Sequence, residues 1–117
     1  MSLLDTDAVL SLLRRGSYEE GAISIITLIE VLRGVAEEKR EQVKLLLEES
    51  FSLLNLNNEV ILRYCSIYDK LRENGENLPD ADLLIAATSL SNNFALKTGD
   101  RHFERLKKFG LSVITIQ

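Results

Sequence analysis

Short apolar runs alternate with longer segments of helical character along the whole of this chain. The runs are rich in Leu, Ile, Val and Phe, which is typical of buried strands, and they fall at residues 1–4, 22–26, 51–56, 94–98 and 111–117. Apolar spacing and start or stop residues predict helices at residues 7–15, 27–34, 37–50, 57–75, 77–93 and 100–109. Strands that alternate with helices predict a parallel sheet covered on both faces, which is an α/β fold.

Length and composition favour one small globular domain. The 117 residues contain no linker and no internal repeat, so we expect residues 1–117 to form a single domain. Cys65 is the only cysteine, which excludes an internal disulfide framework, and we expect it to be a buried thiol. No signal peptide or membrane-spanning stretch is recognisable, and we therefore expect a cytoplasmic protein without a membrane partner.

The net charge of −4 argues against a broad basic groove that wraps nucleic acid by charge alone. It leaves nucleic acid open as a substrate, because bound divalent cations can supply local positive charge. Four cations are candidate contacts to a nucleic-acid backbone, although an ordinary solvated surface position is the competing interpretation for each: Arg33, Arg101, Lys107 and Lys108.

Four acidic residues are placed where the predicted strands and helices meet one edge of the sheet. Asp5 directly follows the first predicted strand, and Asp100 lies just beyond the fourth. Glu30 lies one turn into the helix after the second strand, and Asp82 is in the first turn of a helix that should run antiparallel to the strands. Because ligands of such sheets bind beyond the carboxyl ends of the strands, we expect these side chains to converge there.

Crowded carboxylates repel one another unless a cation lies between them. Mg²⁺ and Mn²⁺ prefer oxygen ligands, and such an ion can activate water and stabilise charge on a phosphate oxygen. The expected convergence therefore predicts a Mg²⁺ or Mn²⁺ site.

Each acid also has a purely structural interpretation. Thr27 and Glu30 fit a capping box, with Thr at the N-cap and Glu at N3. Asp80 is most simply an N-cap, and Asp82 would favour the helix dipole from the first turn. The acids that also fit simple turn or cap positions are Asp5, Asp7 and Asp100. Only their predicted convergence, which caps do not require, favours a shared site.

Four segments follow one another along nearly the whole chain: LLDTDAVLSLL, SIITLIEVLRG, DADLLIAATSL and ALKTGDRHF. In this order and spacing the chain resembles the PIN-domain ribonucleases, and most closely the small VapC-type toxins of toxin–antitoxin pairs. The positions that match the acids of the family are Asp5, Glu30, Asp82 and Asp100. Asp7 stands where many relatives have Asn, and we interpret it as a helix cap.

The resemblance implies a three-layer α/β/α sandwich with a central parallel sheet of about five strands. It also implies metal-dependent hydrolysis of single-stranded RNA, with the four acids as catalytic and metal-binding residues. Thr98, and more weakly Thr6, would hydrogen-bond a ligating carboxylate or the scissile phosphate. The resemblance further implies that the chain forms a homodimer and has a cognate antitoxin that blocks the pocket.

Two other functions fit parts of the sequence. Asp5-Thr6-Asp7 imitates the D-x-D pair of haloacid-dehalogenase-like phosphatases, in which Asp5 would be the nucleophile and Asp7 a general acid. That family's usual Gly-Thr after the pair is missing, and 117 residues leave little room for its core and cap. The second alternative is a PIN-like module that binds a partner without catalysis. His102, the only histidine, is expected at a surface position on its helix.

Overall fold

A computed structural model describes residues 1–116 of the chain. The strands are β1 (Ser2–Leu4), β2 (Ala22–Ser24), β3 (Ser52–Leu54), β4 (Ala95–Thr98) and β5 (Val113–Thr115). The helices are α1 (Thr6–Arg15), α2 (Ile25–Arg33), α3 (Arg40–Ser50), α4 (Asn58–Glu73) and α5 (Asp80–Ser91), with the 3₁₀ segments η1 (Glu37–Lys39) and η2 (Arg101–Phe109). These elements confirm the predicted alternation; Gln117, at the end of the last predicted strand, lies outside the described residues.

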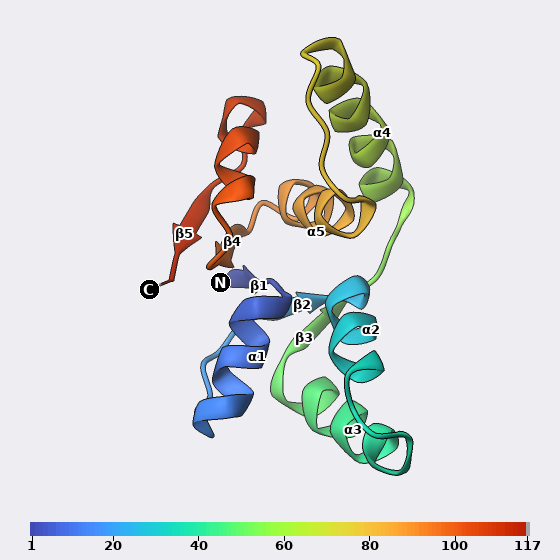
Figure 1. The fold of residues 1–117 in the computed structure, drawn as a ribbon, viewed down its shortest axis with the longest axis vertical. Helices are drawn as coiled ribbons and strands as arrows, with labels where there is room; N and C mark the ends of the chain where they lie inside the picture. The colour runs from blue at the N-terminus through green and yellow to red at the C-terminus, as the bar shows by residue number, and fades with distance from the viewer. Residues whose placement is uncertain (117) are drawn as a thin grey trace.

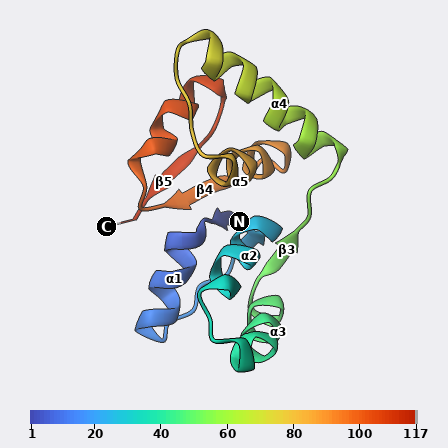
Figure 2. The same cartoon turned by 45° about the vertical axis from the view of Figure 1, so that its right-hand side comes forward.

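The five strands form one parallel sheet in the order β3-β2-β1-β4-β5. Helices α1, α2 and α3 lie on one side of the sheet, whereas α4, α5 and η2 lie on the other (Figures 1 and 2). Each side has its own apolar core, one built around Val9, Leu12 and Leu47 and the other around Leu83, Leu96 and Phe103. The predicted three-layer α/β/α architecture is therefore confirmed.

The strand order places a ligand site between β1 and β4. From β1 the chain builds outward through β2 and β3, and then returns to add β4 and β5 on the other side of β1. Ligands bind at such a reversal point because the loops diverge there. Leu4 pairs with Lys97, and the amide of Asp5 donates to the carbonyl of Lys97 at 3.1 Å. The next residues along each strand, Asp5 and Thr98, are thereby held side by side at the carboxyl edge.

Capping residues define the ends of α1 and α4, and the one at Asp5 confirms a cap position that the sequence offered. Asn57 caps α4 by accepting from the amide of Val60 at 3.0 Å, and Gly16 ends α1 with a left-handed φ of 63°. Asp5 caps α1 by accepting from the amide of Ala8 at 2.9 Å. The interpretation of Asp7 as the cap is therefore wrong, since Asp7 already lies within the first turn of α1.

Two further predicted caps are wrong. Helix α2 begins at Ile25, earlier than the predicted 27, because the hydroxyl of Ser24 accepts from the amide of Thr27 at 3.1 Å. Thr27 therefore occupies the N3 position rather than the N-cap, and Glu30 takes no part in a capping box. Asp80 is also not an N-cap: Pro79 precedes α5, and Asp80 instead accepts from the Tyr64 hydroxyl at 2.5 Å.

Cys65 is exposed, which contradicts the predicted buried thiol. Helix α4 buries Val60, Ile67 and Leu71, and at about 100° per residue Cys65 lies well away from that stripe. No helix within residues 1–116 is long and apolar enough to cross a bilayer.

Candidate active site

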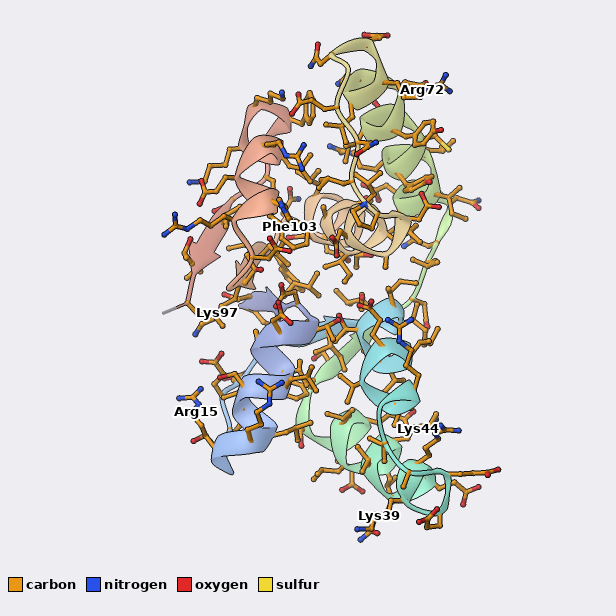
Figure 3. All side chains as sticks on the ribbon, viewed as in Figure 1. Arg15, Lys39, Lys44, Arg72, Lys97 and Phe103 are labelled. Carbon is orange, nitrogen blue, oxygen red and sulfur yellow. The ribbon has the colours of Figure 1, made fainter. Side chains whose placement is uncertain are left out.

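An acidic cavity of about 290 Å³ opens at the carboxyl edge of the sheet, and we call it the acidic cavity below. Its carboxylates come from helices α1, α2 and α5 and from the residues that follow β1 and β4, and they are Asp5, Asp7, Glu30, Asp82 and Asp100. The four acids predicted to converge do line one cavity. Phe103, a residue of η2 on the side that faces α5 (Figure 3), belongs to the apolar part of the wall together with Leu10 and Ile85.

Asp5 is the most deeply buried of these acids, with 4% of its surface exposed. One carboxylate oxygen accepts from the amide of Ala8, and the other accepts from the hydroxyl of Thr98. Burial raises the pKa of Asp5 from 3.8 to about 6, and the nearby Asp7 and Asp100 carboxylates add to the increase. The two hydrogen bonds act in the opposite direction. Asp5 is thus a fixed carboxylate whose charge is poorly compensated by the protein alone.

Thr98 connects Asp5 to the other acid at this end of the sheet. Its hydroxyl donates to Asp5 and accepts from the amide of Asp100 at 2.9 Å, while only 1% of the residue is exposed. Asp100 caps η2 by accepting from the amide of His102, and the imidazole Nδ1 of His102 lies 3.0 Å from the same carboxylate oxygen. Asp100 is therefore both a cap and a wall of the cavity, and His102 is exposed as expected.

Glu30 is oriented by two side chains. The hydroxyl of Thr6 donates to one carboxylate oxygen at 2.6 Å. The guanidinium of Arg33 lies 3.6 Å from the other oxygen, which is outside hydrogen-bonding range. Glu30 is thus held firmly on one side and loosely on the other.

Asp82 feels the other acids through space. Burial raises its pKa, and the carboxylates of Asp100 and Glu30 raise it further. This mutual repulsion is what the sequence predicts for carboxylates that meet across one cavity without a cation.

Two residues line the cavity although the sequence analysis did not place them there. Asp7 contributes a fifth carboxylate, and Arg33 contributes the one cationic side chain among the described residues that line the cavity. The spacing of Glu30 and Arg33 could have indicated that Arg33 lies beside the predicted acids, because residues three apart share a helix face. The position of Asp7 was a weaker indication of a fifth cavity acid, since an acid in the first turn of a helix also has the capping explanation.

The donor set suits a hard divalent cation, but it does not form a complete coordination shell. Within residues 1–116, no three acidic, histidine or cysteine side chains already converge as the ligands of one ion would. Mg²⁺ is commonly held by only one or two carboxylates while it keeps several waters, and Mn²⁺ also prefers oxygen ligands. A wide cavity with carboxylates on several sides therefore fits such an ion together with its waters.

Comparison with known proteins agrees with this geometry. Residues 3–109 match the PIN domain family. The chain belongs to the PIN-domain family. This PIN domain is 40% identical over 115 residues to a protein of Methanocaldococcus jannaschii named ribonuclease VapC1, and the match covers 95% of the chain and 85% of that relative. It is also 30% identical to a Rickettsia bellii protein named ribonuclease VapC, over 99% and 97% of the two chains. The PIN domain is thus of the VapC type.

The fold of this PIN domain is shared with solved structures of low sequence identity. A chain in the structure of DNA-bound VapBC from Salmonella typhimurium superposes with a TM-score of 0.84 at 21% identity, over 98% of each chain. Because the chain belongs to the PIN family, we set the phosphatase alternative aside and do not assign Asp5 as a covalent nucleophile.

Proposed function

We propose that this chain is a metal-dependent endoribonuclease that hydrolyses single-stranded RNA, and that it is the toxin of a toxin–antitoxin pair. The observation that carries the proposal is the convergence of Asp5, Glu30, Asp82 and Asp100 on one cavity from four separate parts of the chain. The VapC-type relatives, one of them 40% identical, are named ribonucleases. The residues 1–117 act as a single PIN domain in this proposal.

The four acids hold Mg²⁺ or Mn²⁺, either directly or through water. Such an ion, when bound, lowers the pKa of water and stabilises negative charge on phosphate oxygens. Asp5 is the central ligand, since it is the most deeply buried of the acids and burial raises its pKa to about 6. Glu30 and Asp82 face it from the helices, and Asp100 completes the set from the end of β4.

The hydroxyl groups beside the acids position them. Thr98 donates to Asp5 and orders the backbone at Asp100, so it fixes two acids at once. Thr6 donates to Glu30 and sets its direction. Positioning groups of this kind raise metal affinity, because the ligands lose less conformational freedom on binding.

The partners in this proposal are RNA, a cognate antitoxin and a second copy of the chain in a homodimer. Solved relatives of the same fold include the VapBC-1 structure from nontypeable Haemophilus influenzae, which matches with a TM-score of 0.80 at 24% identity over 97% of this chain and 96% of that one. The antitoxin would block the acidic cavity, and the expected compartment is the cytoplasm.

The test is cleavage of end-labelled single-stranded RNA by the purified chain with Mg²⁺ or Mn²⁺, with and without chelator. We expect internal cleavage that leaves a 5′-phosphate on one product and stops when the metal is removed. Matched preparations of Glu30→Gln and Glu20→Gln separate the cavity from a distant acid, because Glu20 does not line the cavity. Cleavage that survives chelation, or that both variants retain fully, would contradict the proposal. Binding of RNA without any cleavage would favour the non-catalytic module.

A further inference from the structure

We propose that Arg33 binds the RNA phosphate at the acidic cavity and so sets how strongly the substrate is held. This inference rests on the proposed function and assigns a role that the acids do not have. Arg33 lies in the last turn of α2, three residues after Glu30, and both side chains line the cavity.

The guanidinium of Arg33 is close to the cavity yet free to engage another group. It lies 3.6 Å from Glu30, which is too far for a hydrogen bond, and its side chain is 73% exposed. It donates no hydrogen bond to any residue within the part of the chain that the structure describes. Its five N–H donors therefore remain available, in a planar fork that matches two oxygens of a phosphate.

The other candidate cations differ from Arg33. Lys107 pairs with Glu104 at 2.7 Å, and Lys108 pairs with Glu76 at 2.5 Å. Arg101 follows the cavity residue Asp100 but does not itself line the cavity. Of the four cations singled out from the sequence, Arg33 alone combines a position in the cavity wall with open donors.

Charge explains why a phosphate needs this residue. The five carboxylates of the cavity and one guanidinium give a net charge of −5 + 1 = −4 when all are ionised. Two divalent cations would bring that charge to zero, whereas without Arg33 the same ions would leave −1. An RNA phosphate would then enter a negative cavity, and like charges at such separations repel strongly in a partly buried site.

The experiment measures RNA binding as a function of salt in wild type, Arg33→Gln, Arg33→Lys and Lys107→Gln. Ca²⁺ replaces Mg²⁺, and the RNA is recovered intact after each measurement, so that binding is read without turnover. Loss of one phosphate contact lowers the slope of log affinity against log salt by about 0.7 for a single strand. We expect this change in Arg33→Gln, with binding about 10-fold weaker. Arg33→Lys should keep the slope, and Lys107→Gln, the matched control, should behave as wild type.

A second arm tests which phosphate is bound. After the cleavage position is mapped, the phosphate there is replaced by an uncharged methylphosphonate. If Arg33 holds that phosphate, the modified RNA should bind wild type and Arg33→Gln equally, because the two changes remove the same contact. Additive losses would overturn the assignment.

The remaining outcomes are also decisive. A wild-type chain that cleaves no RNA under any metal condition contradicts the proposed function itself. A wild type that cleaves, beside an Arg33→Gln variant with an unchanged salt slope, contradicts only the role of Arg33. Weaker Mn²⁺ binding in Arg33→Gln with an unchanged salt slope would mean that Arg33 only positions Glu30 and does not contact the RNA. Equal salt slopes for Arg33→Gln and Lys107→Gln would mean that any lost positive charge has the same effect, which also contradicts a specific phosphate contact by Arg33.

Discussion

The acidic cavity has two sides that are built in different ways. At the sheet side, Asp5 and Asp100 lie at strand ends and share Thr98, whose hydroxyl bonds to both residues. At the helix side, Glu30 is held by a single hydroxyl, and a half-buried Asp82 lies in the first turn of α5. On the sheet side Asp5 is buried and fixed by backbone geometry, whereas the helix side depends on individual side-chain contacts.

This difference shows how a cavity can combine a fixed ligand with adjustable ones. The register of β1 and β4 places Asp5 without any contribution from the side chains of the helices. The cost is desolvation, which raises the pKa of Asp5 to about 6. The acids of the helix side are less deeply buried than Asp5, although burial raises the pKa of Asp82 as well. The following predictions test this contrast, in order of decreasing effect.

Asp5→Asn should give the largest loss. It removes the charge of the fixed ligand while keeping its bulk, so RNA cleavage should fall by roughly 1000-fold or more, above the 10- to 100-fold typical of positioning groups. The variant should still fold, because Asn caps a helix about as well as Asp. Single-turnover cleavage and thermal unfolding measure the two effects. Full metal-dependent cleavage by this variant would refute the central role of Asp5.

The second largest effect should be the change in the free energy of unfolding with pH. The folded-state pKa of Asp5, about 6, lies above its ordinary 3.8, so the carboxylate is easier to ionise in the unfolded chain. The contribution of Asp5 to the free energy of unfolding is therefore fully present below about pH 4 and is lost as the pH rises through 6. The loss reaches about 3 kcal/mol in the metal-free protein.

Chemical denaturation of wild type and Asp5→Asn across this pH range isolates the contribution, since the variant cannot ionise there. Excess Mg²⁺ should restore stability above pH 6 in wild type only, because the ion binds the folded state. Parallel stability profiles for the two proteins would show that burial does not destabilise the Asp5 charge.

The sequence predicted the sheet side of the cavity better than the helix side. Strand ends followed by an acid locate Asp5 and Asp100 directly, because parallel strands end at a common edge. Local capping was less predictable. Thr27 and Ser24 both offer a hydroxyl near the start of α2, and only the exact end of β2 decides that Ser24 is the cap. Element ends depend on tertiary packing, so a residue such as Arg33 could be placed on a helix but not in a cavity wall.

Thr98→Val should have an intermediate effect. The substitution keeps the shape of a buried side chain but removes the donor to Asp5 and the acceptor for the amide of Asp100. We expect Mn²⁺ affinity to fall about 10- to 100-fold and stability to fall by about 1–3 kcal/mol, because a buried amide loses its partner. Titration calorimetry and thermal unfolding provide the measurements. Thr98→Ser, which keeps the hydroxyl, is the control and should recover most of the affinity.

Thr6→Val should have the smallest effect, and it makes the comparison quantitative. Its hydroxyl donates to the carboxylate of Glu30 and lies 3.3 Å from the hydroxyl of Thr27, so no backbone amide loses a partner when it is removed. Glu30 also keeps the nearby guanidinium of Arg33 and access to solvent, so Mn²⁺ affinity should fall by less than about 10-fold. The same calorimetric titration gives the ratio of the Thr6→Val and Thr98→Val losses. A loss at Thr6 equal to or greater than that at Thr98 would mean that the helix side, rather than the sheet side, fixes the metal.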